Sequence, residues 1–197
     1  MTRIIMGSVA AGLLLGYFVV PDSWMEWTEP VLVAVLCILL FFVGITLGMD
    51  GTVIENFKKV SWRIMIFPMA SIAGTLAAAA LVSFFLPITL RESMAVGAGF
   101  GWYTLAPVVL SDYSAQLSAV SFVHNVLREL VGIILIPTVA ARIGHIECTS
   151  LPGAGAMDVC LPIVEKATSP NIAVYSFVTG VTMTIMVPVL VPFFVGL

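Results

Sequence analysis

Arg128 and Glu129 are neighbours in a segment whose composition suits the interior of a lipid bilayer. The segment, residues 119–141, reads AVSFVHNVLRELVGIILIPTVAA. A charged side chain near the centre of a bilayer costs about 2.5–3.5 kcal/mol on insertion scales. Neighbours on an α-helix point about 100° apart, so these two side chains cannot simply neutralise each other. Each needs a partner elsewhere or a wet cavity, which makes the pair the first candidate for function.

The same segment carries a polar stripe. Polar and small residues recur at three- and four-residue spacing, as on one face of a helix: Ser118, Ser121, His124, Asn125, Arg128, Glu129 and Gly132. Asn125 can hydrogen-bond to Glu129 one turn away, and His124 to Arg128. The stripe is either a buried network that joins helices or a face toward a substrate or proton route. A carboxylate inside the membrane favours the second interpretation, with Arg128 as its counter-ion.

Asp158 is a second acidic residue in an apolar setting. It lies between Gly155 and Pro162 in the stretch 152–164, PGAGAMDVCLPIV, which is too short to span the hydrocarbon core. Irregular backbone at membrane depth is tolerated only inside protein or beside a cavity. In transporters, such broken segments turn carbonyl groups and half-helix ends toward the solute. The pattern predicts a site for a cation or a proton; the alternative is a cap on a short interfacial helix.

A second interrupted stretch, 94–110, contains the glycine run GAGFGW. The run lacks the GxGxxG spacing of a dinucleotide loop, and no βαβ pattern surrounds it. We interpret it as a binding turn lined by backbone, with close helix packing by small residues as the alternative. The residues of both interrupted stretches that are predicted to line the substrate are Gly99, Gly101, Trp102, Tyr103, Gly153 and Gly155.

Composition identifies the elements that must position these residues. Of 197 residues, 60% are hydrophobic and 10% are charged, whereas a soluble domain has about 25% charged residues. The chain is therefore predicted to be an all-α integral membrane protein with a single transmembrane domain over residues 1–197. Segments long and apolar enough to span are 4–20, 31–47, 64–86, 119–141 and 172–195. These five full spans are joined by the two interrupted or re-entrant stretches.

The distribution of cations predicts the orientation. Lys58 and Lys59 lie in the second loop, whereas the first loop, 21–29, has three acidic residues and no Lys or Arg. The positive-inside rule then places the amino terminus in the cytoplasm. If both interrupted stretches dip in and return, Arg142 also lies inside, Arg91 lies outside, and the carboxyl terminus is external.

Other classes of function find little support. The net charge of −3 argues against nucleic acid as a partner, and the cysteines, Cys37, Cys148 and Cys160, lack metal-site spacing. We expect no metal and no cofactor, and we read Cys37 and Cys160 as packing residues. An intramembrane aspartyl protease needs two facing aspartates, one in a GxGD turn, but the turn here reads GAMD. We therefore expect no enzyme.

Four stretches together resemble the bacterial LysO-type lysine exporter family in order and spacing. They are LFFVGITLGMD at 40–50, GFGWYTLAPVVL at 99–110, HNVLREL at 124–130 and GAMDVCLPI at 155–163. The resemblance implies a secondary transporter of the bacterial inner membrane that exports L-lysine and its toxic analogue thialysine. It also implies that the carboxylates of its RE and MD motifs, Glu129 and Asp158, are essential.

The resemblance also bears on partners and mechanism. It covers the carboxyl-terminal two-thirds of full-length members, which carry additional helices in front. It thus implies a homo-oligomer, or a separate small subunit that supplies those helices; the alternative is a non-transporting subunit of a split transporter. Outward movement of one positive charge against an inside-negative potential costs about 2.3 kcal/mol per 100 mV, so lysine export needs coupling. We predict proton antiport in which Glu129 and Asp158 alternate between substrate and protons, supported by Arg128, Asn125 and His124.

Overall fold

The computed structural model describes residues 2–19 and 62–196, with isolated positions between 21 and 49. Within these residues every regular element is a helix and there is no strand, as predicted. The α-helices are α1 (Thr2–Phe18), α4 (Ile66–Val82), α5 (Leu90–Gly97), α6 (Leu105–Ser111), α7 (Ala115–Arg142), α8 (Leu161–Ala167) and α9 (Pro170–Val195). Three 3₁₀ helices complete the described part: η2 (Trp62–Met65), η3 (Glu147–Ser150) and η4 (Gly153–Met157).

Two of the described helices, α7 and α9, are long and apolar enough to cross a membrane. They contain 28 and 26 residues, and the shorter α4 is equally apolar in character. The predicted spans 4–20, 64–86, 119–141 and 172–195 correspond to α1, α4, α7 and α9. The predicted span 31–47 lies largely outside the described residues. The described part of the chain is all-α, as expected of an α-helical membrane protein.

Local sequence signals set the helix ends. At the start of α7, the Ser114 hydroxyl accepts a hydrogen bond from the backbone N–H of Leu117 at 3.3 Å. Such a cap satisfies one of the free N–H groups of the first turn. The last helix, α9, begins at Pro170, whose fixed φ suits a first turn. It ends at Val195 and is followed by Gly196, whose left-handed φ of +76° is typical of a helix stop.

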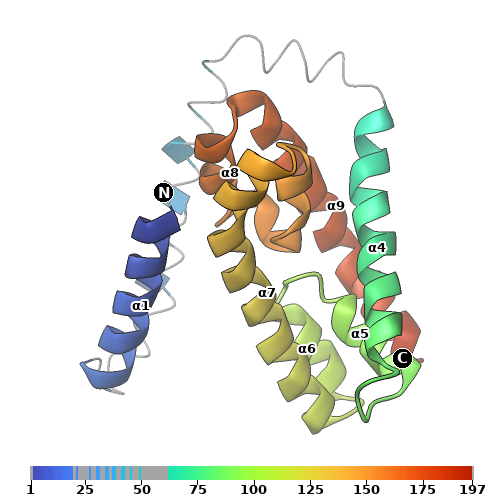
Figure 1. Ribbon diagram of the computed structural model, residues 1–197. Helices are drawn as coiled ribbons and strands as arrows, with labels where there is room; N and C mark the ends of the chain where they lie inside the picture. Colours follow the sequence, from blue (N-terminus) through green and yellow to red (C-terminus); the bar gives the residue numbers. More distant parts are fainter. Residues whose placement is uncertain are drawn as a thin grey trace.

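Both predicted interruptions are present. The stretch 94–110 holds the end of α5, an irregular turn and most of α6, and we call 90–111 the α5–α6 segment. The stretch 152–164 holds η4 and the start of α8, and we call 153–167 the η4–α8 segment. Both segments pack against α7 and α9, and they approach each other between these two long helices (Figure 1).

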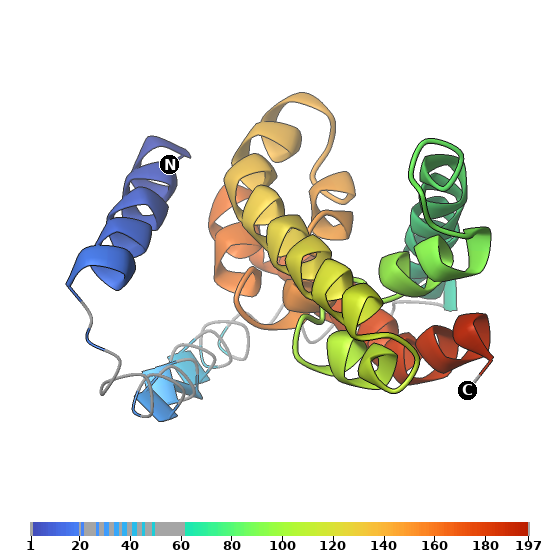
Figure 2. The same ribbon diagram turned by 90° about the horizontal axis from the view of Figure 1, so that it is seen from below.

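Two clusters of buried apolar side chains hold this arrangement together. The first joins α4, α5, α6, α7 and α9 and includes Ile72, Phe100 and Met183. The second joins α7 with η3 and α8 and includes Ile136 and Val164. Seen from two directions, α1 lies to one side of the molecule and α4 to the other (Figures 1 and 2). The candidate site residues are therefore carried by α7 and by the two broken segments in the middle.

Candidate functional site

The two broken segments meet through their backbones at a place we call the crossing, made by Phe100–Gly101 and Pro152–Ala154. The backbone N–H of Ala154 donates a hydrogen bond to the carbonyl of Phe100 at 2.7 Å. Gly101 has a φ of +92°, and a Cβ there would lie 2.7 Å from the Pro152 carbonyl oxygen. Gly153 has a φ of +69° and faces the Phe100 carbonyl in the same way. Only glycine combines this conformation with so close an approach.

Asn125 on α7 holds one side of the crossing. Its side chain is fully buried, and its Oδ1 accepts a hydrogen bond from the Gly101 N–H at 2.7 Å. Its Nδ2 donates to the carbonyl and the hydroxyl of Ser121, at 2.8 and 3.1 Å. Gly99 packs directly against this amide. The predicted hydrogen bond between Asn125 and Glu129 is therefore wrong, because the amide already has partners on the α5–α6 segment and on its own helix.

Glu129 and Asp158 come together at Gly155. A Cβ on Gly155 would lie 3.3 Å from Oε1 of Glu129 and 3.6 Å from Oδ1 of Asp158. Both acidic residues are half-buried. Glu129 comes from α7, whereas Asp158 follows η4 and accepts a hydrogen bond from the Val159 N–H at 2.6 Å. The structure thus brings two sequence-predicted carboxylates from different elements to one side of one glycine.

Two other side chains lie within electrostatic reach of both carboxylates, Tyr103 and Cys160. Tyr103 was predicted to line the substrate, and its ring meets Phe122 of α7 edge to face at 6.5 Å. Cys160, predicted to be a packing residue, is fully buried. Asp158 is only two residues before it in the sequence, but nothing in the sequence indicates that Glu129 lies near it as well. Trp102, by contrast, packs against the first apolar cluster.

Arg128 turns to the backbone before η4. Its Nε donates to the Leu151 carbonyl at 3.3 Å, and its Nη2 donates to the Ser150 carbonyl at 3.4 Å and the Thr75 hydroxyl at 3.5 Å. The guanidinium carbon lies 5.8 Å from the centre of the Phe100 ring. Among the described residues it forms no ion pair with a carboxylate. Sequence reasoning missed Thr75, a polar residue in an apolar helix that carries no sign of its partner.

A sequence profile of the lysine exporter LysO family matches residues 6–195. The chain belongs to this family. It is 29% identical over 160 residues to "Lysine exporter LysO" of Escherichia coli strain K12, a match that covers 81% of this chain and 53% of that protein. It is 28% identical over 196 residues to "Putative lysine exporter" of Haemophilus influenzae strain Rd, which covers 96% of each chain. No solved structure matches the chain.

The two LysO-family relatives differ in length relative to this chain. The chain spans about half of the E. coli protein and nearly all of the H. influenzae protein. The profile match includes α7 and both broken segments. The whole crossing and the carboxylate pair therefore lie in the part that this LysO-family chain shares with its family.

The predicted polar stripe of α7 divides between two faces. Ser121, Asn125 and Gly132 are buried, whereas His124 is exposed on the outer face of the helix. Its exposed neighbours on that face are apolar, among them Val123 and Leu127. The division arises because the residues at 121, 125 and 132 follow one helical face, which the α5–α6 segment and Pro152 cover. His124 stands apart from the carboxylate pair.

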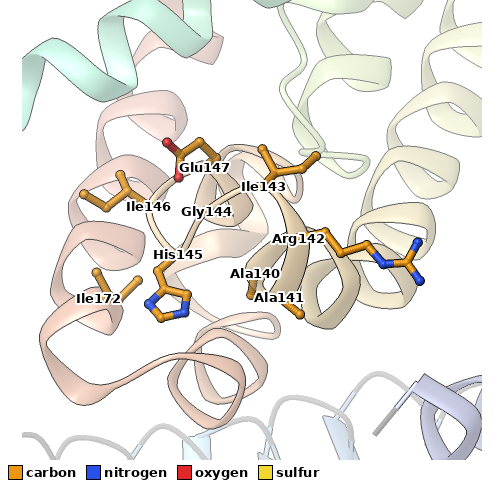
Figure 3. A pocket seen from close by; sticks show the side chains of 9 residues that line it. All are labelled: Ala140, Ala141, Arg142, Ile143, Gly144, His145, Ile146, Glu147 and Ile172. Atoms are coloured by element: carbon orange, nitrogen blue, oxygen red, sulfur yellow. The ribbon is translucent and has the colours of Figure 1, made fainter.

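A separate cavity of about 520 Å³ opens at the end of α7 (Figure 3). It is lined by Ala140, Ala141, Arg142, Ile143, Gly144, His145, Ile146, Glu147 and Ile172. Figure 3 shows the Arg142 side chain pointing away from the other lining side chains. Neither carboxylate of the central pair lines this cavity. Within the described part of the LysO-family chain, no group of three or more His, Cys, Asp or Glu is placed to hold a metal ion.

Proposed function

We propose that this chain forms the transport core of a secondary exporter for L-lysine and related cationic amino acids such as thialysine. The meeting of Glu129 and Asp158 at Gly155 carries the proposal. Carboxylates inside a membrane protein are expensive and mark ion or substrate pathways. The names of both relatives, a lysine exporter and a putative lysine exporter, support the cationic amino acid as cargo.

The proposed mechanism is proton antiport in the inner membrane. Two neighbouring carboxylates in a medium of low dielectric repel each other, so a cation or a proton between them is favoured. An ammonium group of lysine and a proton can therefore replace one another at this pair. Since outward movement of a positive charge costs about 2.3 kcal/mol per 100 mV, inward proton movement has to drive the exchange.

The proposal includes one transmembrane domain, residues 1–197, with five full spans, a cytoplasmic amino terminus and an external carboxyl terminus. The course of the chain in Figure 1 supports it. The end of α4, the start of α7 and the carboxyl terminus lie at one end of the molecule, and the end of α7 lies at the other. In such a course, α4, α7 and α9 cross, and each broken segment returns to the side from which it enters.

A second copy, or a separate small membrane subunit, completes the proposed exporter. The observation behind this is the match to the E. coli relative, which leaves almost half of that protein without a counterpart. If the unmatched part of the E. coli protein is obligatory for transport, the chain alone is a non-transporting subunit of a split transporter. The half-buried state of Glu129 and Asp158 fits a site that a further polypeptide covers.

The deciding experiment uses charge-removing variants in a bacterial strain that lacks its own exporter. Glu129→Gln and Asp158→Asn, singly and together, should abolish thialysine resistance. Glu165→Gln on α8, a matched loss of a carboxylate outside the pair, should keep it. Flux of labelled lysine into liposomes under an imposed pH gradient, with and without a candidate small subunit, then identifies the unit that transports. Full resistance in the double variant contradicts the proposed function.

A further inference from the structure

The surroundings of Arg128 suggest a role other than charge compensation. Each of its three hydrogen bonds ends on a neutral oxygen: two carbonyls, of Ser150 and Leu151, and the hydroxyl of Thr75. The adjacent residue Glu129 points to Gly155 instead. Hydrogen bonds from a charged donor are about twice as strong as neutral ones. The guanidinium therefore binds backbone carbonyl groups, and among the described residues it forms no ion pair with Glu129 or Asp158.

The Arg128 side chain also lies close to one residue of each broken segment. A Cβ on Gly153 would lie 3.2 Å from its guanidinium carbon, and the centre of the Phe100 ring lies 5.8 Å from the same carbon. These two residues belong to the crossing, where Ala154 donates to the Phe100 carbonyl. One turn earlier on α7, Asn125 holds Gly101 of the same crossing. The helix that carries Glu129 thus holds both broken segments by side chains on successive turns.

We propose that Arg128 is a positioning residue that fixes the η4–α8 segment on α7 and thereby sets Asp158 opposite Glu129. The chain from Ser150 to Asp158 is short and largely buried, so fixing its start restricts its end. The flat guanidinium reaches two carbonyls at once, a geometry that the single ammonium of lysine does not reproduce. This role rests on the proposed function of the carboxylate pair, but it can be measured without transport.

The test compares Arg128→Lys, which keeps the charge, with Arg128→Gln, which removes it. Cys160 reports on the segment, because it is fully buried and its N–H bonds to the Gly155 carbonyl. With Cys37 and Cys148 replaced by serine, the rate of Cys160 modification by a membrane-permeant maleimide measures local opening. We expect both variants to raise this rate about ten-fold or more, because they lose charge-assisted hydrogen bonds. Thr75→Val, which removes one bond and little volume, should raise it less.

Two controls separate positioning from general loss of structure and from a counter-ion role. Ile72→Ala in the first apolar cluster should lower the thermal midpoint yet leave the Cys160 rate unchanged. The pH midpoint of lysine export should be the same in both Arg128 variants as in the parent, while the maximal rate falls equally. An unchanged Cys160 rate, or export restored by lysine together with a shifted pH midpoint in Arg128→Gln, overturns the proposal. If the proposed function is wrong, Glu129→Gln still exports lysine, and the Cys160 modification rates remain as expected for the positioning role.

Discussion

Arg128 and Glu129 are neighbours in the chain, yet their side chains have opposite surroundings. Arg128 donates hydrogen bonds to two carbonyls and a hydroxyl. The Glu129 carboxylate receives no hydrogen bond from the residues that the structure describes, and it lies with a second carboxylate, that of Asp158, on one side of Gly155. A pair of acids with few donors around it gains most from a bound cation or proton. The proposed function assigns this place between the two acids to the ammonium group of lysine or to a proton.

Gly155 tests this site at the smallest scale. In Gly155→Ala, the methyl group would lie 3.3 Å from Oε1 of Glu129 and 3.6 Å from Oδ1 of Asp158. It would occupy the space for a bound ammonium group while leaving both acids in place. One extra methyl in a binding pocket changes recognition by about 1–3 kcal/mol, so lysine export should fall about ten-fold or more. Radiolabelled lysine efflux from cells with equal amounts of protein in the membrane measures this.

The matched control for Gly155→Ala is Gly74→Ala. A methyl group at Gly74 on α4 meets no other atom within 4 Å. Export should therefore remain at the parent level in this variant. Equal export by the two alanine variants would show that no ligand lies between the carboxylates at Gly155.

Individual residues show how far the sequence leads. Glu129 and Asp158 could be selected as candidates, because an acid in an apolar stretch is rare and costly. The meeting of Glu129 with Asp158, Gly155 and Cys160 could not be predicted, since a contact between α7 and the distant stretch 155–160 leaves no periodic signal. The partners of Arg128 were also hidden. Carbonyl groups occur at every residue, so a sequence does not indicate which ones an arginine binds.

Among the elements, the two broken segments depend on glycines for their close approach. Gly153→Ala would place a methyl against the Phe100 carbonyl in a left-handed conformation. The conformation alone costs about 1–2 kcal/mol for an L-residue, and overpacking adds about 1–3 kcal/mol. We expect a clear fall in the thermal midpoint of the purified protein in detergent, together with loss of export.

Gly196→Ala separates the two contributions in Gly153→Ala. Gly196 has a similar φ of +76°, but a methyl there meets no atom within 4 Å. This variant should show only the conformational cost, about 1–2 kcal/mol. If both variants lower the thermal midpoint equally, the close approach of Gly153 to Phe100 contributes nothing to stability.

The start of α5 provides a pH-dependent prediction outside the spans. A backbone hydrogen bond from Thr89, followed by one from its side chain, lowers the pKa of Glu92 from 4.5. A lowered pKa in the folded state gives stability that is present above 4.5 and lost as pH falls through the folded value. Hydrogen exchange in α5 should therefore be faster in Glu92→Gln at neutral pH. The free energy of local opening should fall by about 0.5 kcal/mol or less, because the carboxylate is exposed. Below the folded pKa the two proteins should exchange alike; a difference that persists there would contradict the charge effect.

The elements themselves were largely predictable. Apolar length indicated α1, α4, α7 and α9, and clustered glycine and proline indicated the two interruptions. The crossing was not predictable, since its hydrogen bond joins Phe100 and Ala154 from stretches far apart in sequence. The stripe on α7 was misassigned for a related reason. Spacing alone places His124 and Asn125 near each other, and only the packing of Gly101 against Asn125 separates a buried face from an exposed one.

At the scale of the whole molecule, the broken segments and the long helices have complementary roles. The α5–α6 segment and the η4–α8 segment approach the crossing from opposite ends of α7 (Figure 1). Each carries part of the site, whereas α7 contributes Glu129 to the same place. A pathway through the middle of the molecule would thus be reached from one side along one broken segment and from the other side along the other. This arrangement makes the orientation in the membrane directly relevant to transport.

Orientation can be measured with two exposed positions at opposite ends of this arrangement. Arg91 lies at the start of α5, and His145 lies beside the cavity at the end of α7. In a chain whose three cysteines are replaced by serine, the thiol in R91C should react with a membrane-impermeant maleimide in intact cells. The thiol in H145C should react only after the cells are permeabilised, because positively charged loops stay in the cytoplasm. The reverse pattern would mean that the chain has the opposite orientation in the membrane. Reaction of both thiols in intact cells would mean that the two positions lie on the same side, which contradicts α7 as the one span between them.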